Sequence, residues 1–206
     1  EVQPSFTDLR AFSWWNYGQG PERQFRIEPR YTAQISDLQS KEDRELLANF
    51  RSVRRQEIKR AASLQGLEIS TEDVWHQIMD CYLELMAKSG VQIEKKSRAL
   101  SGLKSLVESG WGFSMATVDS TTKMIASFSV VLRAKNTSNL VLMGTDSRHR
   151  QTGIGPLHIF KTLQACRNLG DSVLDFNGAN SPARGDDKHS YGAKEVLFFR
   201  LTYDPR

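Results

Sequence analysis

Six consecutive residues form a glycine turn whose composition and spacing suit the binding of an anionic group. They are Arg150, Gln151, Thr152, Gly153, Ile154 and Gly155. The turn follows the apolar run Leu140–Met143 and precedes a predicted helix that extends from Pro156 to about Leu169. The unpaired N–H groups and the dipole at the start of a helix stabilise negative charge, and glycine lets the backbone approach a ligand closely. We therefore predict contact with a phosphate group. The alternative is a plain strand-to-helix turn in which the glycines only relieve strain.

The same segment resembles motif A of the GNAT acyltransferases, in which a strand-to-helix loop wraps the pyrophosphate of acyl-coenzyme A. Residues 145–150 are similar to the irregular approach to that loop. Two later motifs resemble the Fem-type branch of this superfamily: Asp-Phe-Asn-Gly at residues 175–178, and Lys-His-Ser-Tyr-Gly-Ala at residues 188–193. Residues 52–61, followed by Gly66 and Leu67, are similar to the arginine-rich helix of the same domain. The resemblance extends over residues 45–203.

This resemblance implies an α+β fold with a mostly antiparallel central sheet flanked by helices. It also implies an N-acyltransferase that uses acyl-CoA, such as acetyl-CoA, as co-substrate and transfers the acyl group to an amine by direct attack. The acceptor amine would belong to a small molecule or a peptide. Two alternatives are a Fem-type aminoacyl-tRNA-dependent transferase that acts on a cell-wall peptide precursor, with tRNA as a partner, and a non-catalytic accessory lobe.

Acyl transfer to an amine needs a group that accepts the amine proton and donors that stabilise the oxyanion. Asp175 and Asn177 lie near the end of a predicted strand, on one side in a period-two pattern. We expect Asp175 to act as general base or to orient the amine, and Asn177 to hold a carbonyl group. Ser190 and Tyr191 are candidates for the general acid that protonates the leaving group. The structural alternatives are that Asp175 caps the next turn or pairs with a core arginine, and that Tyr191 is a packed aromatic residue.

The composition is that of a globular protein, because 206 residues with 39% hydrophobic and 25% charged side chains suit one domain. No apolar run approaches the roughly 18 residues that a membrane-spanning helix needs, and we expect a cytoplasmic protein. The net charge of +4 suits an anionic cofactor or substrate. Cys81 and Cys166 are predicted to be buried free thiols. Cysteine and histidine lack metal-ligand spacing, so that no metal is expected.

Hydrophobic periodicity predicts helices over residues 42–63, 70–90 and 98–108, and antiparallel strands over 113–118, 124–132 and 140–143. Ser70 is the expected N-cap of the second helix, and Gly90 its end. Residues 181–189, which include Asp186, Asp187 and Lys188, are expected to form a polar loop. One interpretation is a mobile loop that faces the substrate, and the other is a loop that is only solvated.

A basic stripe is predicted on the first helix, where Arg51, Arg55 and Lys59 are spaced at i, i+4 and i+8. One interpretation is contact with phosphate, and the other is a solvated face that pairs with Glu57 and Asp43.

Residues 1–30 contain Trp14, Trp15 and Tyr17 among glycine and proline, without a long periodic element. They are predicted to be an irregular segment, the tail of an upstream lobe, whereas residues 31–206 form the acyltransferase domain. Fem-type proteins usually contain two such lobes. A second lobe or a homodimer is therefore the expected partner, and the aromatic cluster is an expected interface.

Overall fold

The computed structural model describes residues 7–71, 74–88 and 94–204. Within these ranges a seven-stranded sheet has the strand order β2-β3-β4-β5-β6-β1-β7. Its strands are β1 (Arg26–Ile35), β2 (Leu67–Ser70), β3 (Gly112–Asp119), β4 (Ile125–Ala134), β5 (Thr137–Thr145), β6 (Val173–Asp175) and β7 (Lys194–Thr202). The neighbours β5 and β6 are parallel, whereas the other neighbouring pairs are antiparallel. The expected α+β fold with a mostly antiparallel sheet is confirmed.

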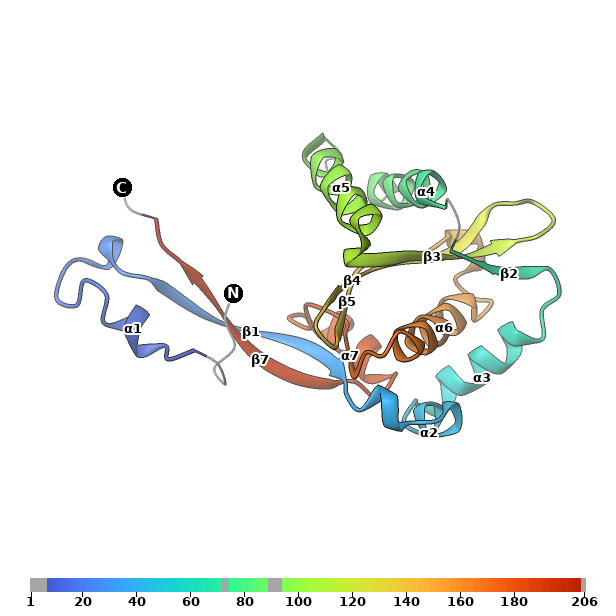
Figure 1. Cartoon of the computed structure of the whole chain (residues 1–206), viewed down its shortest axis with the longest axis horizontal. Coiled ribbons are helices and arrows are strands. Elements are labelled where there is room, and N and C mark those ends of the chain that lie inside the picture. Colours follow the sequence, from blue (N-terminus) through green and yellow to red (C-terminus); the bar gives the residue numbers. More distant parts are fainter. Residues whose placement is uncertain (1–6, 72–73, 89–93, 205–206) are drawn as a thin grey trace.

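Helices cover both faces of this sheet (Figure 1). One face carries α2 (Asp43–Ala48), α3 (Ser52–Ala62) and α6 (Ile154–Asn168), and the other carries α4 (Trp75–Lys88) and α5 (Glu94–Leu106). The shorter helices are α1 (Arg10–Ser13), α7 (Pro182–His189), η1 (Pro21–Arg23), η2 (Leu38–Ser40), η3 (Val107–Trp111) and η4 (Ser147–His149). Each layer of helices encloses its own hydrophobic core, one around Leu163 of α6 and one around Ile78 of α4.

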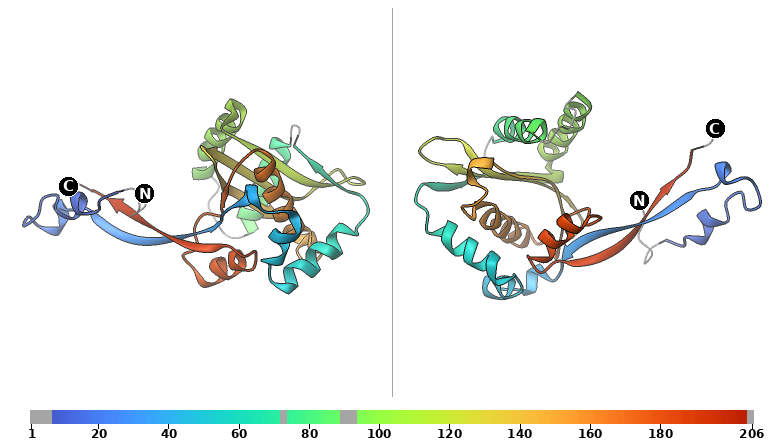
Figure 2. Two further views of the ribbon diagram at one scale, coloured as in Figure 1. Left: turned by 60° about the horizontal axis from the view of Figure 1, so that its bottom comes forward. Right: turned by 180° about the vertical axis from the view of Figure 1, so that it is seen from behind.

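The two strands β1 and β7 extend beyond the rest of the sheet as a ribbon, with α1 near its far end (Figure 2). Near that end Phe25 contacts Phe12 and Tyr203, with ring centroids 5.2 Å and 4.9 Å apart. Trp14 and Tyr17 are exposed. Residues 1–30 are therefore not irregular throughout, because β1 begins at Arg26 and continues across the predicted domain boundary.

Two predicted helical features are wrong. The predicted helix over residues 42–63 is two helices, because Arg51 has the extended backbone conformation of a residue that precedes a helix. Ser70 is not an N-cap but the last residue of β2, which pairs with β3. β3 and β4 are joined by a hairpin, in which Asp119 accepts hydrogen bonds from the N–H groups of Thr121 and Thr122. Gly90, the expected helix end, lies outside the described residues.

Candidate acyl-transfer site

The glycine turn lies between the end of β5 and the start of α6, as predicted. Gly153 has a φ of +86°, and a Cβ atom there would overlap the backbone carbonyl of Glu57 on α3. A Cβ atom at Gly155 would lie 2.7 Å from Oγ1 of Thr145 at the end of β5. Both glycines are thus required for close packing of the turn against its neighbours. Close packing alone neither requires nor excludes a bound phosphate.

An arginine that the sequence interpretation missed holds this turn. Arg60, near the end of α3, donates to the backbone carbonyls of Gln151 at 2.7 Å and Thr152 at 3.3 Å. Within the described chain, the N–H groups of Gly153 and Gly155 donate to no protein acceptor. Arg150 is exposed. Unpaired donors at the start of α6 therefore accompany an exposed cation, as expected of an anion site.

The irregular approach to the turn is formed by η4. Asp146 accepts a hydrogen bond from the N–H of Arg148 at 2.8 Å and pairs with its guanidinium at 2.9 Å. The Arg148 guanidinium beside Asp146 lowers the pKa of that carboxyl to about 2. Asp146 is thus ionised, and its carboxylate is engaged in the ion pair with Arg148.

The parallel strands β5 and β6 diverge immediately after a short paired region. Pairing joins Thr137–Asn139 to Val173–Asp175 only. β5 then continues to Thr145, whereas the chain after β6 turns towards β1, where the N–H of Phe176 donates to the carbonyl of Ala33 at 2.8 Å. The two strands are therefore unpaired beyond Asn139 and Asp175. We call the unpaired region, which extends from this point to the end of β5 and the glycine turn, the opening between β5 and β6.

Two features mark the point at which the strands separate. Val141 is an extra residue in β5, because Val130 pairs with Leu142 and Val131 with Leu140. Such a bulge leaves backbone groups outside the regular ladder. On the other side, Asn177 donates through Nδ2 to the carbonyl of Leu140 at 2.8 Å and so bridges the opening.

A cavity of about 380 Å³ lies beside this point. Its lining includes Leu106, Trp111, Leu132, Asn139, Val141 and Asn177. The sequence interpretation identified Asn177 as a candidate site residue but not Val141 or Trp111. Val141 was missed because a bulge arises from the register of two strands, which has no signal in the sequence of either strand alone.

Asp175 is buried at the end of β6, and its carboxylate has several donors. Oδ2 accepts from Nε2 of Gln34 at 2.8 Å, and Oδ1 accepts from the N–H of Asn177 at 2.6 Å and from the hydroxyl of Thr32. Asp175 therefore caps the turn that follows β6 by accepting the hydrogen bond from Asn177, as its structural alternative predicted. Asn177 lies beyond the strand with a φ of +56°, so the expected period-two relation between the two residues is wrong.

Tyr191 is buried, with 2% of its surface exposed. Its ring packs against Phe50 and Phe176, with centroids 5.4 Å and 6.1 Å away, and the guanidinium of Arg54 lies 5.1 Å from the ring centroid. Burial raises the pKa of Tyr191 above its usual range. No hydrogen bond in the described chain joins Tyr191 to Asp175 or Asn177. This environment is that of the packed aromatic residue considered as the alternative.

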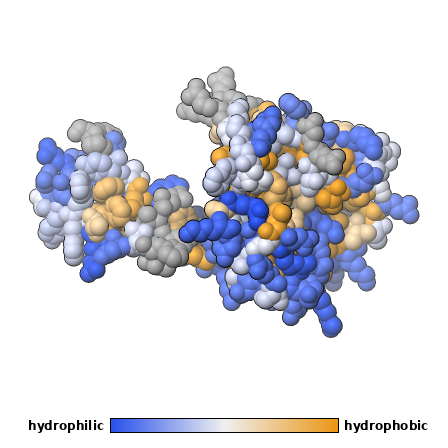
Figure 3. All heavy atoms as spheres, viewed as in Figure 1, coloured by the Kyte–Doolittle hydropathy of each residue, from blue (hydrophilic) through white to orange (hydrophobic). Residues whose placement is uncertain are grey.

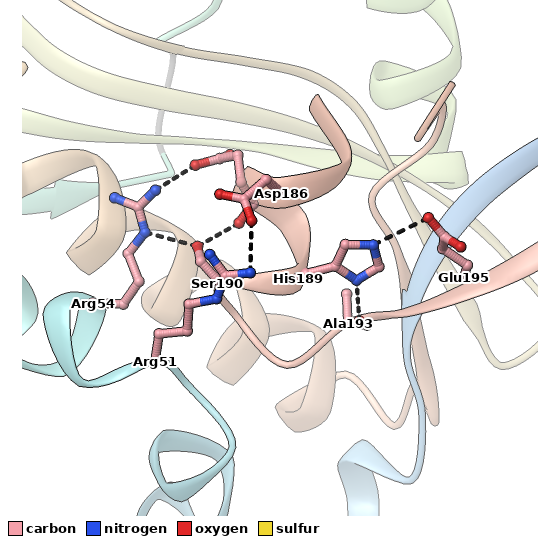
Figure 4. Close-up of polar contacts among 8 residues, drawn as sticks. Arg51, Arg54, Asp186, His189, Ser190, Ala193 and Glu195 are labelled. Carbon is pink, nitrogen blue, oxygen red and sulfur yellow. Dashed lines mark hydrogen bonds and ion pairs between the residues drawn. The ribbon is translucent and has the colours of Figure 1, made fainter. Parts of the chain in front are cut away.

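Residues 181–189 are not a loop, because residues 182–189 form the whole of α7, which is attached to α3 by charged pairs (Figure 4). Arg51 pairs with Asp186 at 2.6 Å, and Arg54 pairs with Asp187 at 2.6 Å. Arg54 also donates through Nε to the hydroxyl of Ser190 at 2.8 Å. At the end of α7, His189 donates through Nδ1 to the carbonyl of Ala193 at 3.0 Å.

The basic stripe is therefore largely engaged within the protein. Arg51 pairs with Asp186 rather than with the expected Glu57 or Asp43, and Arg55 donates to the carbonyl of Phe50. Figure 3 shows a mainly hydrophilic surface over α2 and α3. The sequence pattern located a charged face correctly but not the partner of Arg51.

Lys188, also on α7, donates to the carbonyls of Asn177 and Gly178. Burial lowers the pKa of this ammonium group. It holds the turn after β6 in place, and with it the side chain of Asn177 at the opening.

The comparison with protein families identifies the class of this chain. The model of the family described as "Acetyltransferase (GNAT) domain" matches residues 48–189. This range is more than half of the chain, and the chain belongs to the GNAT acetyltransferase family. The protein is therefore an acyltransferase. A comparison with curated protein sequences gave no match.

Solved structures confirm a Fem-like GNAT fold. FemX aligns with a TM-score of 0.70 and 14% identity, over 96% of this chain and 68% of FemX. The C-terminal domain (DUF2156) of a putative lysylphosphatidylglycerol synthetase from Agrobacterium fabrum aligns with a TM-score of 0.61 and 14% identity, over 87% of this chain and 62% of that one. For L-PGS from Bacillus licheniformis the TM-score is 0.56 and the identity 11%, over 88% and 62%. The chain thus spans about two thirds of the length of these structures, or slightly less.

The described residues contain neither a membrane-spanning helix nor a metal-binding cluster. No helix there is long and apolar enough to span a membrane. No group of three or more histidine, cysteine, aspartate or glutamate side chains in the same ranges is arranged to hold a metal ion. Cys81 and Cys166 are free thiols; Cys166 is buried and Cys81 is partly buried.

Proposed function

We propose that this protein is an N-acyltransferase that transfers an acyl group from acyl-CoA, such as acetyl-CoA, to the amine of a small molecule or peptide. The observation that carries the proposal is the opening between β5 and β6, which has a bulge near the last strand pair and leads, at the end of β5, to the turn that begins α6. Acyl-CoA carries its thioester at one end of a flexible arm and its diphosphate at the other. The bulge is suited to the thioester, and the start of α6 is suited to the diphosphate.

The residues of the glycine turn fit the diphosphate. The N–H groups of Gly153 and Gly155 have no protein acceptor within the described chain, and the cationic side chain of Arg150 is exposed beside them. Gln151, Thr152 and Ile154 belong to the same turn, which Arg60 keeps in one conformation. Acyl-CoA supplies an activated thioester when it is bound.

Near the last strand pair, backbone groups of the bulge at Val141 and the side-chain amide of Asn177 hold the acyl carbonyl and stabilise negative charge on its oxygen. Asp175 orients the attacking amine, and its three hydrogen-bond donors keep the carboxylate in one position. The neutral amine attacks the carbonyl carbon directly and forms the C–N bond, and the C–S bond breaks as the tetrahedral species collapses. The proton that the nitrogen loses passes through solvent to the departing thiolate. Tyr191 supports this region by packing, and we assign it no role in proton transfer.

The aminoacyl-tRNA alternative would require cations that are free to bind phosphate. Arg51 and Arg55 of the basic stripe are already engaged with Asp186 and Phe50. The pairing of these arginines therefore does not favour the aminoacyl-tRNA alternative.

The test is calorimetric titration of the protein with coenzyme A and acetyl-CoA. Arg150→Ala removes one charge-assisted contact, for which a loss of about 1.5 kcal/mol, or roughly tenfold in affinity, is expected. Arg26→Ala is the matched control, because Arg26 is an exposed arginine on the β1–β7 ribbon. No binding to the wild type at millimolar ligand, or equal losses in both variants, would refute the proposal. A glycine variant is unsuitable, since a side chain at Gly153 would displace α3.

A further inference from the structure

The cavity beside the opening has mostly apolar walls. Its apolar lining residues are Leu106, Trp111, Leu132, Ala134 and Val141. Leu106 ends α5 and Val141 packs against the core around α4, so the cavity lies on the face of the sheet that carries these two helices (Figure 1). Trp111 and Leu106 are 60% and 43% exposed and belong to neither core. Exposed apolar side chains that line a hollow are typical of a ligand-binding surface.

The polar residues of the lining lie beside the opening or are paired within the protein. Asn139 belongs to the last pair between β5 and β6, and Asn177 bridges the opening. Arg133 donates to both carboxylate oxygens of Asp171 and to the carbonyl of Leu169. Its charge is therefore paired with a buried carboxylate, and the cavity is apolar except beside the opening.

Tight packing at the start of β3 positions the outer wall of the cavity. Gly112, the residue after Trp111, lies opposite Leu132, and a Cβ atom at Gly112 would overlap the backbone carbonyl of Val131. Leu132 pairs in turn with Asn139 of β5. The lining thus extends over two strand spacings, about 10 Å. A methyl group, which is about the size of a water molecule at ~30 Å³, would fill only a small part of the cavity of about 380 Å³.

The position of the cavity favours the acyl group of the donor as its occupant. Val141 and Asn177, which are assigned to the acyl carbonyl, both line the cavity. Asp175, which is assigned to the attacking amine, is not among the lining residues within the described chain. A chain attached to the carbonyl carbon would therefore begin at the cavity, whereas a chain attached to the amine nitrogen would begin beside Asp175.

We propose that this cavity binds the apolar chain of a medium-chain acyl-CoA, such as octanoyl-CoA, and that Trp111 and Leu106 select this chain over an acetyl group. The inference rests on the proposed N-acyltransferase function and names the class of acyl donor. Each methylene group that is buried on binding contributes roughly fourfold to affinity. An apolar wall about 10 Å long therefore distinguishes strongly between a long and a short chain.

The experiment is calorimetric titration of the protein with coenzyme A, acetyl-CoA, octanoyl-CoA and succinyl-CoA. The wild type should bind octanoyl-CoA at least about tenfold more tightly than acetyl-CoA, and excess coenzyme A should displace it. Succinyl-CoA, whose chain ends in a carboxylate, should bind no more tightly than acetyl-CoA. Trp111→Ala and Leu106→Ala should each reduce the preference for octanoyl-CoA at least about fourfold, the equivalent of one buried methylene group. Urea unfolding checks that both variants are folded.

Two matched controls test whether the effect is local to the cavity. Trp15→Ala removes a tryptophan that is 53% exposed, and Leu64→Ala removes a leucine that is 43% exposed. Neither residue lines the cavity, so both variants should keep the preference. Equal losses in the variants and their controls would overturn the inference.

Titration with octylamine tests the other possible occupant, an apolar chain on the acceptor. If Trp111→Ala weakens the binding of octylamine but not that of octanoyl-CoA, the cavity holds the acceptor and the inference is wrong. Equal binding of acetyl-CoA and octanoyl-CoA by a wild type that binds coenzyme A would refute the inference alone. Failure of the wild type to bind coenzyme A or any of its thioesters would refute the proposed function as well.

Discussion

Acidification should destabilise this protein through one buried histidine of α6. His158 is fully buried, and its ring nitrogens Nδ1 and Nε2 lie 2.9 Å from the hydroxyl of Thr117 and 3.0 Å from that of Ser129. Hydroxyl groups both donate and accept, so they satisfy a neutral imidazole. Burial lowers the pKa of His158 to about 3.

The magnitude follows from the difference between the folded and unfolded states. An unfolded histidine has a pKa of about 6.5, so the unfolded chain takes up a proton at a pH where folded His158 remains neutral. The stability that neutral His158 contributes is complete above pH ~6.5 and is lost progressively as the pH falls towards the folded pKa of about 3. Each pH unit in that range costs about 1.4 kcal/mol, which gives about 2 kcal/mol between pH 7 and pH 5.

The assay is urea unfolding of the wild type and His158→Gln at pH 7 and pH 5. Glutamine supplies a donor and an acceptor but does not titrate, and the other histidines titrate equally in both proteins. The variant should be less stable at pH 7 and should lose about 2 kcal/mol less than the wild type on acidification. Parallel losses in the two proteins would show that His158 is not the neutral, desolvated group described above.

Three further substitutions test how backbone conformation and buried pairs contribute to stability. Gly153→Ala should lower the free energy of unfolding by about 1–3 kcal/mol, because the new Cβ atom would meet the backbone of Glu57 in an unfavourable φ region. Gly102→Ala, on an open surface of α5, should instead stabilise by up to about 1 kcal/mol, and the same sign for both would contradict the reasoning. Asp171→Ala should cost about 3 kcal/mol in urea unfolding, because Asp171 is buried and pairs with Arg133 at 2.7 Å. A cost below about 0.5 kcal/mol would show that the pair is equivalent to an exposed one.

Strands were predictable where their side chains alternate over a full length. β4 has such a pattern, whereas β5 was predicted from the continuous apolar run of residues 140–143, whose side chains contact the cores on both faces of the sheet. β1 was missed, since Pro29 and several charged residues reduce strand propensity. Pro29 is tolerated because β6 pairs only with Gln34 and Ile35, which leaves β1 with one ladder neighbour there.

β2 was missed for a different reason. Its four residues are too few for a periodic signal, and the strand exists because it pairs with β3. A short edge strand of this kind is stabilised by its neighbour rather than by its own sequence. The serine at its end then resembled a helix cap.

The glycine turn, the helix that follows it and the Asp-Phe-Asn-Gly segment are local features that could be predicted from the sequence, and the resemblance that they carry gave the acyltransferase class. Their signals arise from φ preferences, helix capping and side-chain periodicity within a few residues. The distant groups that complete the site became visible only in the fold. Thr32 is 143 residues from the Asp175 carboxylate that it contacts, and Arg60 is 91 residues from the carbonyl of Gln151. Those contacts depend on strand order and register, which arise when apolar faces of separate segments are buried together and which no local pattern encodes.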